Sequence, residues 1–297
     1  MVAMSIRRRP AQPNSFFGQE DLARQLNRLM AAGNAHNVIF AGPSGTGKTT
    51  AAMMVAGGSL CSAVGERPCL KCRACLDVAR GVHAAQHFVD CAHQGGKEDI
   101  DHLFQQETGH APIDAACHQI ILDEADLLSR SAQSALLIPT QDTAGYRRFL
   151  LTCTDPEALI RPLRDRCRIV RHDDPNQSEA VQFLEETTRE ENIAVEDGAI
   201  ELMAAACRGY RNLLETLESA ADLANGAPID ADLLRTKVLR DRSTVLLEYL
   251  SELASGDVER QRELLDQCSL SAIEKVRGLR NILAHLRVHH TGPRLTR

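Results

Sequence analysis

The segment Gly42–Thr49, which reads GPSGTGKT, constrains the fold of this chain more than any other feature. The apolar run Val38–Ala41 precedes it, and a helix-like run, Thr50–Ala56, follows it. Strand, glycine-rich loop and helix in this order are the setting of a phosphate-binding P-loop, because glycines let several backbone N–H groups turn towards one oxyanion. A glycine-rich turn that matches by chance is the alternative, but it accounts for neither flank. The segment therefore predicts a bound nucleotide.

The residues of this loop predict how the phosphates are held. The helix N-terminus behind the loop adds the positive end of its dipole. Lys48 is expected to reach the β and γ phosphates, and the Thr49 hydroxyl is expected to hold Mg²⁺. The predicted nucleotide-binding residues are Gly42, Pro43, Ser44, Gly45, Thr46, Gly47, Lys48, Thr49 and Thr50.

A second apolar run, Gln119–Leu122, ends in the acids Asp123 and Glu124, which is the arrangement called Walker B. Asp123 is expected to hold the Mg²⁺ shell, and Glu124 to activate the attacking water as general base. A strand that ends in two acids is also common on protein surfaces. Here it follows a P-loop in a chain that alternates strand and helix, so it predicts hydrolysis of ATP.

Two further side chains are candidates for the same site. Phe149–Asp155 reads as another buried strand, and ligands collect at the C-terminal edge of parallel sheets. Thr154 is therefore placed to sense the γ-phosphate, although a threonine that caps the next turn is the alternative. Four arginines follow between Arg161 and Arg168, and we single out Arg166, which lies just before an apolar strand. A plain surface cluster of arginines remains possible on the residues alone.

Four cysteines follow the P-loop helix with the spacing C-x7-C-x2-C-x2-C. Four thiolates this close in sequence can form a closed tetrahedral site, so we predict structural Zn²⁺ bound by Cys61, Cys69, Cys72 and Cys75. A redox CxxC motif is the rival, but it needs only two cysteines. A chance group of buried thiols is the third interpretation.

Composition limits the setting in which the chain works. The net charge is −6 and aromatic residues make up 3 %, so any contact with nucleic acid must use a local basic face. No apolar run approaches the ~20 residues of a membrane span. The basic start, Met1–Arg9, has no apolar core after it, so we expect no secretory signal, no membrane partner and a cytoplasmic location.

The pattern of elements divides the chain into three parts. Strands and helices alternate up to residue 172, with the cysteine insertion at about 58–80. Helices alone are expected at 177–192, 196–208 and 211–225, and further helices from 230 onward. We therefore predict an ATPase core at 1–172, a three-helix lid at 173–228 and a short helical collar-like domain at 229–297.

Residues 8–225 resemble the ATPase subunits of sliding-clamp loaders, which are AAA+ proteins, and most closely the gamma/tau type of bacterial DNA polymerase III. The resemblance rests on Gly18–Glu20, the P-loop, Asp123-Glu124 followed by Leu127–Ser129, Thr152–Pro156 and Arg166-Cys167. The four cysteines placed directly after the P-loop helix are the most specific feature. The resemblance implies a parallel five-stranded sheet flanked by helices, followed by a helical lid and a C-terminal helical domain.

The resemblance also implies roles for individual residues. Thr154 matches the residue called sensor 1, and Arg166 matches an arginine finger that acts on ATP held by a neighbouring subunit. Arg211, in the run Gly209–Asn212, matches the sensor 2 arginine of the lid. The catalytic set implied is thus Lys48, Asp123, Glu124, Thr154, Arg166 and Arg211, with ATP, Mg²⁺ and structural Zn²⁺ as bound groups.

The family suggests a function and partners as well. It implies an oligomer of about five subunits that opens a sliding clamp and loads it onto primed DNA. Asp165 stands where the family has Ser, residues 138–142 lack its acidic proline-rich run, and the segment after 230 is shorter than its collar. Alternatives are a non-hydrolysing structural subunit similar to delta-prime, another AAA+ motor on DNA, or a defence ATPase. The intact P-loop and Glu124 argue against a non-hydrolysing subunit, and the four cysteines argue against another AAA+ motor.

Overall fold

The computed structural model describes residues 2–31, 36–141, 145–196, 198–234 and 238 of the 297-residue chain. The described residues form two compact units, which are treated separately. The first contains residues up to Phe183 together with Arg208–Glu215, and the second contains Leu184–Cys207 and the described residues from Thr216 onward. Whether the ATPase core ends at residue 172 stays a prediction.

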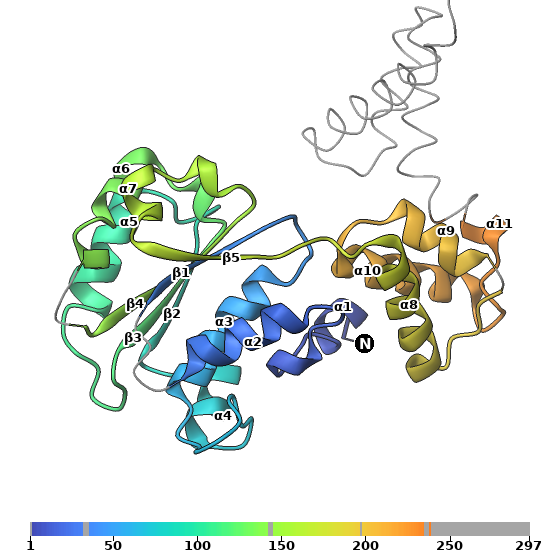
Figure 1. Ribbon diagram of the computed structural model, residues 1–297, viewed down its shortest axis with the longest axis horizontal. Coiled ribbons are helices and arrows are strands. Elements are labelled where there is room, and N and C mark those ends of the chain that lie inside the picture. Colours follow the sequence, from blue (N-terminus) through green and yellow to red (C-terminus); the bar gives the residue numbers. More distant parts are fainter. Residues whose placement is uncertain (1, 32–35, 142–144, 197, 235–237, 239–297) are drawn as a thin grey trace, which may run out of the picture. The chain divides into compact units, whose positions relative to one another are not determined.

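A parallel sheet forms the centre of the first unit (Figure 1). Its five strands lie in the order β2-β3-β4-β1-β5, with β1 paired to β4 through Val38 and Leu150, and to β5 through Asn37 and Cys167. All four strand pairs are parallel. The strands are β1 Asn37–Ala41, β2 Gln86–Asp90, β3 His118–Asp123, β4 Arg147–Cys153 and β5 Cys167–Arg171. The predicted parallel five-stranded sheet is confirmed.

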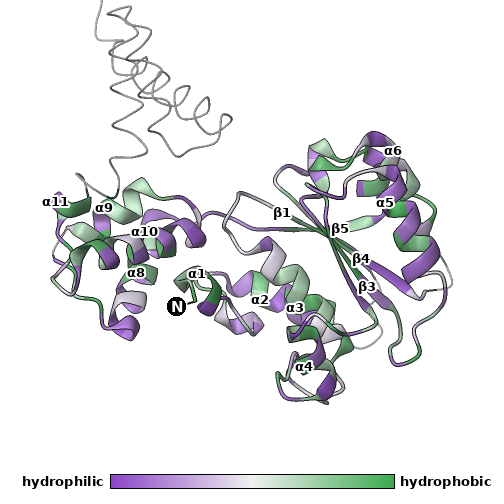
Figure 2. Cartoon of the chain, turned by 180° about the vertical axis from the view of Figure 1, so that it is seen from behind, coloured by the Kyte–Doolittle hydropathy of each residue, from purple (hydrophilic) through white to green (hydrophobic). Residues whose placement is uncertain are grey.

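Helices cover both faces of this sheet (Figure 1). Because side chains alternate along a strand, Ile39 and Ala41 face one core while Val38 and Phe40 face the other. The first core packs against α5 (Lys97–His102), α6 (Arg130–Ala135) and α7 (Arg161–Arg164), and the second against α2 (Glu20–Met30) and α3 (Lys48–Leu60). The hydropathy colours of Figure 2 show the apolar middle of the sheet between these partly hydrophilic helices. Strands buried on both faces explain the near-continuous apolar runs in the sequence.

Shorter elements connect these layers. The arm before α2 contains α1 (Met4–Arg7) and a 3-10 turn, Pro13–Ser15, and α4 (Arg73–Ala79) follows the cysteines. The spacing of Ile100, Leu103 and Phe104 in the sequence predicts one helix over residues 97–106, but α5 ends at His102 and continues as a π-helical turn, Leu103–Glu107. Further 3-10 turns span Ala125–Leu127, Pro139–Gln141 and Pro156–Ala158.

Helices alone follow the sheet, as the sequence predicts. They are α8 (Gln177–Glu191), α9 (Ala199–Ala206), α10 (Gly209–Ala224) and α11 (Ala231–Leu233). In the second unit a short parallel bridge joins Val195 to Ile229, and the Ile229 N–H donates to Ala194 O at 2.9 Å. Most of the predicted collar-like domain, 229–297, lies outside the described residues. In the part of the chain that the structure describes, no helix is long and apolar enough to cross a membrane.

Two adjacent glycines let neighbouring helices approach α3 closely. A Cβ atom on Gly57 would lie 3.0 Å from Val78 Cγ1 of α4, and one on Gly58 would lie 2.0 Å from Met30 Sδ of α2. Glycine inside a helix costs roughly 1 kcal/mol relative to alanine. The close packing of both neighbours on α3 offsets this cost.

We therefore expect Gly58→Ala to lower the free energy of unfolding by about 1–3 kcal/mol, because overpacking of Met30 outweighs the gain in helix propensity. Urea unfolding followed by circular dichroism measures the change. Met30→Ala is the matched second mutation, and the double variant should be more stable than the sum of the two single effects predicts. A Gly58→Ala variant as stable as the wild type would show that this contact does not constrain the packing.

Candidate functional site

The P-loop connects the end of β1 to the start of α3, and its shape depends on glycine at two close contacts. A Cβ atom on Gly42 would lie 2.1 Å from the backbone oxygen of His172. Gly47, at φ +93°, caps α3 and would bring a Cβ atom within 2.9 Å of the Phe16 ring. The loop is therefore held between β5 and the N-terminal arm.

The predicted nucleotide-binding residues divide into two groups. A polar cleft of about 100 Å³ is lined by Ser44, Gly45, Gly47, Lys48, Thr49 and Thr50 of the loop and helix. Gly42, Pro43 and Thr46 do not line it. Instead the buried Thr46 hydroxyl donates to Pro43 O at 2.9 Å and braces the loop from within.

Lys48 folds over this loop. Its Nζ donates to Pro43 O at 2.8 Å. Burial lowers the pKa of the Lys48 ammonium, and the nearby Asp126 and Asp123 carboxylates act in the opposite direction. A half-buried lysine at the mouth of a P-loop is placed to exchange its carbonyl partner for a phosphate oxygen.

Asp123 joins the P-loop helix to the sheet. Its Oδ1 accepts hydrogen bonds from Thr49 Oγ1 at 2.8 Å and from Thr152 Oγ1 at 2.6 Å. The structure thus brings together the two residues predicted to hold Mg²⁺. Carboxylate and hydroxyl oxygens are the ligands that this ion prefers, so the residues present fit it.

Glu124 lies beside Asp123 in a left-handed backbone conformation, at φ +53°, and its N–H donates to Thr152 Oγ1 at 3.0 Å. Burial raises the pKa of the Glu124 carboxyl, and the nearby charges of Asp123, Asp90 and Asp126 add to the effect. A non-glycine residue in this conformation is uncommon and occurs preferentially at functional sites. A carboxylate with a raised pKa suits a general base.

Thr154 lines the same cleft, but its side chain already has a partner. Its N–H and its hydroxyl both donate to Asp126 Oδ2, at 3.0 and 2.5 Å. Sequence reasoning missed Asp126 and Thr152, although both line the cleft. The signal for Thr152 was its two-residue spacing from Thr154, which places both on one side of an extended chain.

Arg211 reaches the cleft from the start of α10. Its N–H donates to Gly45 O at 3.3 Å, and Gly209 packs against Ser44 O, which would lie 2.7 Å from an added Cβ atom. Arg166 is different. It donates to Pro162 O of α7 and is absent from the residues that line the cleft of this chain.

An apolar cleft of about 90 Å³ adjoins the P-loop, on the side of the N-terminal arm. Phe17 packs edge-to-face on Phe183 at 5.4 Å between ring centroids, and Phe183 packs on Tyr210 at 4.9 Å. The Tyr210 hydroxyl donates to Phe17 O at 3.0 Å. Neither Phe183 nor Tyr210 was predicted, because only the fold brings these two residues of the first unit to the arm.

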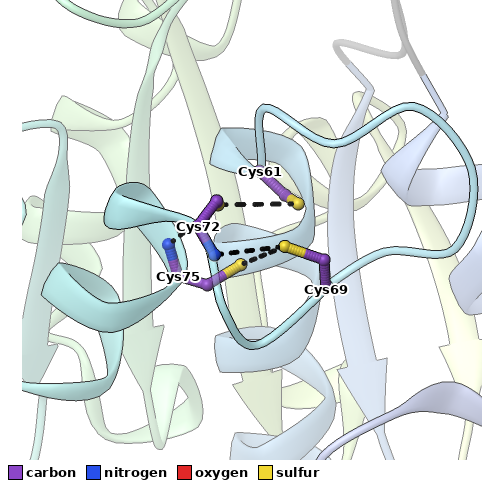
Figure 3. A group of neighbouring side chains, drawn as sticks. All are labelled: Cys61, Cys69, Cys72 and Cys75. Atoms are coloured by element: carbon purple, nitrogen blue, oxygen red, sulfur yellow. Dashed lines mark hydrogen bonds between the residues drawn. The ribbon is translucent and has the colours of Figure 1, made fainter.

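The four predicted cysteine ligands converge (Figure 3). All four Sγ atoms lie within 4.8 Å of one another, with 3.9 Å between Cys61 and Cys72 and 4.0 Å between Cys69 and Cys75. Zn–S bonds of about 2.3 Å in a tetrahedron require sulfur atoms about 3.8 Å apart, so the geometry fits zinc. Among the described residues no other group of three or more His, Cys, Asp or Glu side chains is arranged to hold a metal.

Backbone donors around the sulfur atoms favour thiolates. The Cys75 N–H donates to Cys72 Sγ at 3.4 Å and lowers the pKa of the Cys72 thiol to about 5. The Cys72 N–H donates in turn to Cys69 Sγ at 3.3 Å. Burial acts in the opposite direction on Cys75 and raises its pKa to about 12, so a full set of four thiolates needs a bound cation.

Comparison with known proteins places these features in a family. Residues 18–176, more than half of the chain, match the family described as DNA polymerase III, delta subunit. The replication factor C small subunit of Archaeoglobus fulgidus is 27% identical over 263 residues, which cover 87% of this chain and 76% of that protein. The DNA polymerase III subunit tau of Bacillus subtilis is 28% identical over 271 residues, which cover 87% of this chain but only 47% of the relative.

Solved structures agree on the fold. The Thermotoga maritima RuvB Holliday junction branch migration motor superposes with a TM-score of 0.60 at 18% identity, covering 83% of this chain and 80% of that one. At this identity the similarity shows the fold and no more. Together with the family match, it shows that the chain belongs to the DNA polymerase III delta subunit family, among the clamp-loader AAA+ ATPases.

Proposed function

We propose that this chain is an ATPase subunit of a DNA sliding-clamp loader, which binds and hydrolyses ATP to open a clamp and load it onto primed DNA during replication. One observation carries the proposal. Thr49 of the P-loop and Thr152 of β4 share Asp123 Oδ1, with Glu124 held beside them through Thr152. This arrangement joins phosphate binding to water activation in a member of the clamp-loader family.

The residues of the cleft have complementary roles in hydrolysis. Lys48 and the N–H groups of the loop bind the β and γ phosphates, and Asp123 and Thr49 would hold Mg²⁺, which neutralises phosphate charge. Glu124 accepts the proton of the attacking water. Thr154 senses the γ-phosphate, and its contact with Asp126 positions it at the edge of the cleft.

The neighbouring apolar cleft suits the base of the nucleotide. The rings of Phe17, Phe183 and Tyr210 supply an apolar surface directly beside Gly45 and Gly47. Arg211 borders both clefts, so it can contact phosphate while α10 lies against the P-loop. Residues 173–228 would then act as a lid whose position depends on the nucleotide.

Arg166 would complete the site of a neighbouring subunit. It does not reach the cleft of its own chain, and an arginine supplied in trans is worth about 10³–10⁵ in rate at related sites. We propose that the chain assembles with other loader subunits into a ring of about five, so that hydrolysis depends on assembly. A sliding clamp and primed DNA would be the further partners.

We also propose that the four cysteines hold a structural Zn²⁺. The sulfur geometry fits a tetrahedral ion, and the four ligands leave no open coordination position for catalysis. The ion would fix the 58–80 insertion against α3.

ATP turnover should rise when primed DNA and a sliding clamp are added to a reconstituted loader that contains this chain. Phosphate release measured with and without each component tests this directly. Unprimed duplex DNA serves as the control for non-specific binding. If neither clamp nor primed DNA changes the rate, the chain acts in a different AAA+ machine.

Glu124→Gln should keep ATP binding and lower the turnover number about 10²–10⁴-fold, because the amide cannot accept the proton of water. ATP affinity and phosphate release are measured on the same sample. Glu98→Gln, an exposed carboxylate of α5, is the matched control and should leave both unchanged. Undiminished turnover by Glu124→Gln would rule out the assigned base, and undetectable turnover by the wild-type assembly would favour a structural subunit.

Mixing two inactive variants tests the shared site. A Glu124→Gln chain retains Arg166, and an Arg166→Ala chain retains Glu124. If the finger acts in trans, assemblies that contain both variants should regain part of the activity that each has lost. Persistent inactivity of the mixture, in assemblies of normal size, would contradict a finger in trans.

The purified chain should contain one Zn²⁺, and Cys72→Ser should remove it, since three thiolates bind the ion far more weakly. Metal content is measured by atomic emission, and limited proteolysis should cleave the variant within 58–80. Cys117→Ser, a half-buried thiol outside the cluster, is the matched control. Full zinc content in Cys72→Ser would mean that the ion lies elsewhere.

A further inference from the structure

A second apolar cleft lies beside α3, on the side of the cysteine insertion. Met53, Met54 and Gly57 of α3 line it together with Val78 of α4, and Leu70 and Arg9 lie at its edge. All of these residues belong to the first unit. Of the predicted nucleotide-binding residues, Thr50 also lines this cleft, and zinc binding alone does not require the cleft.

The shape of the cleft suits apolar side chains. Its volume is about 200 Å³. Most of its lining residues are apolar and Arg9 is the charged one among them, so it suits one or two large apolar side chains. Met53 and Met54 are among its lining residues, and methionine adapts its flexible side chain to different apolar partners.

Leu70 presents an apolar side chain at the edge of this cleft. It is 47% exposed and has φ +59°, a left-handed conformation that leucine rarely adopts. It lies between Cys69 and Cys72, and the Cys72 N–H donates to Cys69 Sγ across this turn. Strained residues of this kind occur preferentially where a protein binds something.

The segments that line the cleft belong to a basic part of the chain, although the whole chain is acidic. Arg9 lines the cleft, and the insertion carries Arg67, Lys71, Arg73 and Arg80 against only Glu66 and Asp77. Figure 2 shows hydrophilic and hydrophobic residues side by side around α4. In the described part of the chain, Arg73 pairs with Asp77 at 3.5 Å, while neither Lys71 nor Arg80 forms an ion pair. A local positive field in a chain of net charge −6 favours an acidic partner.

We propose that this cleft is a docking site for a linear segment of a partner protein, in which one or two large apolar side chains are flanked by aspartate or glutamate. The apolar side chains pack on Met53, Met54 and Val78, and Leu70 covers them from the edge. The acidic flanks face Arg9 and the unpaired lysine and arginine of the insertion. An apolar anchor supplies affinity, and the charges supply orientation and speed of association.

Docking of the segment should also change the affinity of the nucleotide site. Thr50 lines this cleft, the polar phosphate cleft and the apolar cleft beside the P-loop. A segment that contacts Thr50 from one side therefore alters the surface that a nucleotide contacts from the other. Because such coupling is reciprocal, ATP should change the affinity of the segment by the same factor as the segment changes that of ATP.

A phage-displayed library of random twelve-residue peptides, selected on the zinc-loaded full chain without nucleotide, tests the proposal. Selected peptides should combine Leu, Phe or Met with flanking Asp or Glu. Their affinity, measured by fluorescence anisotropy of the labelled synthetic peptide, should fall at least about tenfold in Leu70→Asp, which removes the apolar contact and adds repulsion. It should also fall with rising salt.

Matched variants separate docking from misfolding. Val64→Asp changes a fully exposed apolar residue of the same insertion outside the cleft, and it should bind the peptide normally. Lys71→Glu should weaken binding, while Lys97→Glu, an exposed lysine of α5, should not. Met53→Gln provides an independent variant on α3 if Leu70→Asp loses zinc.

Three results would overturn the proposal. The first is a selection whose peptides bind Leu70→Asp and Met53→Gln as tightly as the wild type. The second is a set of peptides without acidic residues, whose binding does not depend on salt. The third is a selection that yields no peptide whose binding depends on the cleft, combined with a change of oligomeric state in Leu70→Asp. That result would assign the cleft to a second copy of the chain. Because binding is measured without nucleotide, failure here leaves the proposed ATPase function untouched.

Discussion

The two hydrogen bonds accepted by Asp123 Oδ1 are the interaction on which the rest of the site depends. Thr49 donates from the first turn of α3 at 2.8 Å, and Thr152 donates from β4 at 2.6 Å. The sheet sets both distances, because β4 pairs with β3 on one side and with β1, which leads into the P-loop, on the other. The oxygen atoms that Mg²⁺ prefers are thus gathered by strand order, so hydrolysis chemistry depends on the sheet as a whole.

The contacts of His172 are a second constraint on the P-loop. His172 is buried, its N–H donates to Ala41 O at 2.8 Å, and its Nδ1 lies 3.2 Å from Thr46 O. Burial lowers the pKa of the His172 imidazole to about 4, so the ring is neutral near pH 7 and uses its single N–H to donate to this carbonyl. The backbone oxygen of the same residue leaves no room for a side chain at position 42. His172, the residue directly after β5, therefore contacts the P-loop at two places, at Gly42 and at Thr46.

Local features could be read from the sequence because their geometry is encoded over a few residues. The glycines of the P-loop, the acids at 123 and 124 and the cysteine spacing each define a short segment, and the described structure contains each segment in the expected kind of element. Thr152, Asp126, His172 and Tyr210 were missed because their importance depends on which strands and helices become neighbours. The π-helical turn at Leu103 was missed for a related reason, since apolar spacing alone does not distinguish it from α-helix.

The helix α3 connects the features that the sequence showed separately. Its N-terminus forms the P-loop, and Cys61, the first cysteine of the cluster, caps its C-terminus after 13 residues, about 20 Å away. Gly57 and Gly58 let α4 and α2 pack against it without intervening side chains. The helix α3 therefore packs against the cysteine insertion at Gly57 and lines the phosphate cleft with Lys48 and Thr49. A partner bound at the insertion would thus contact the same helix that carries the predicted phosphate-binding residues Lys48 and Thr49.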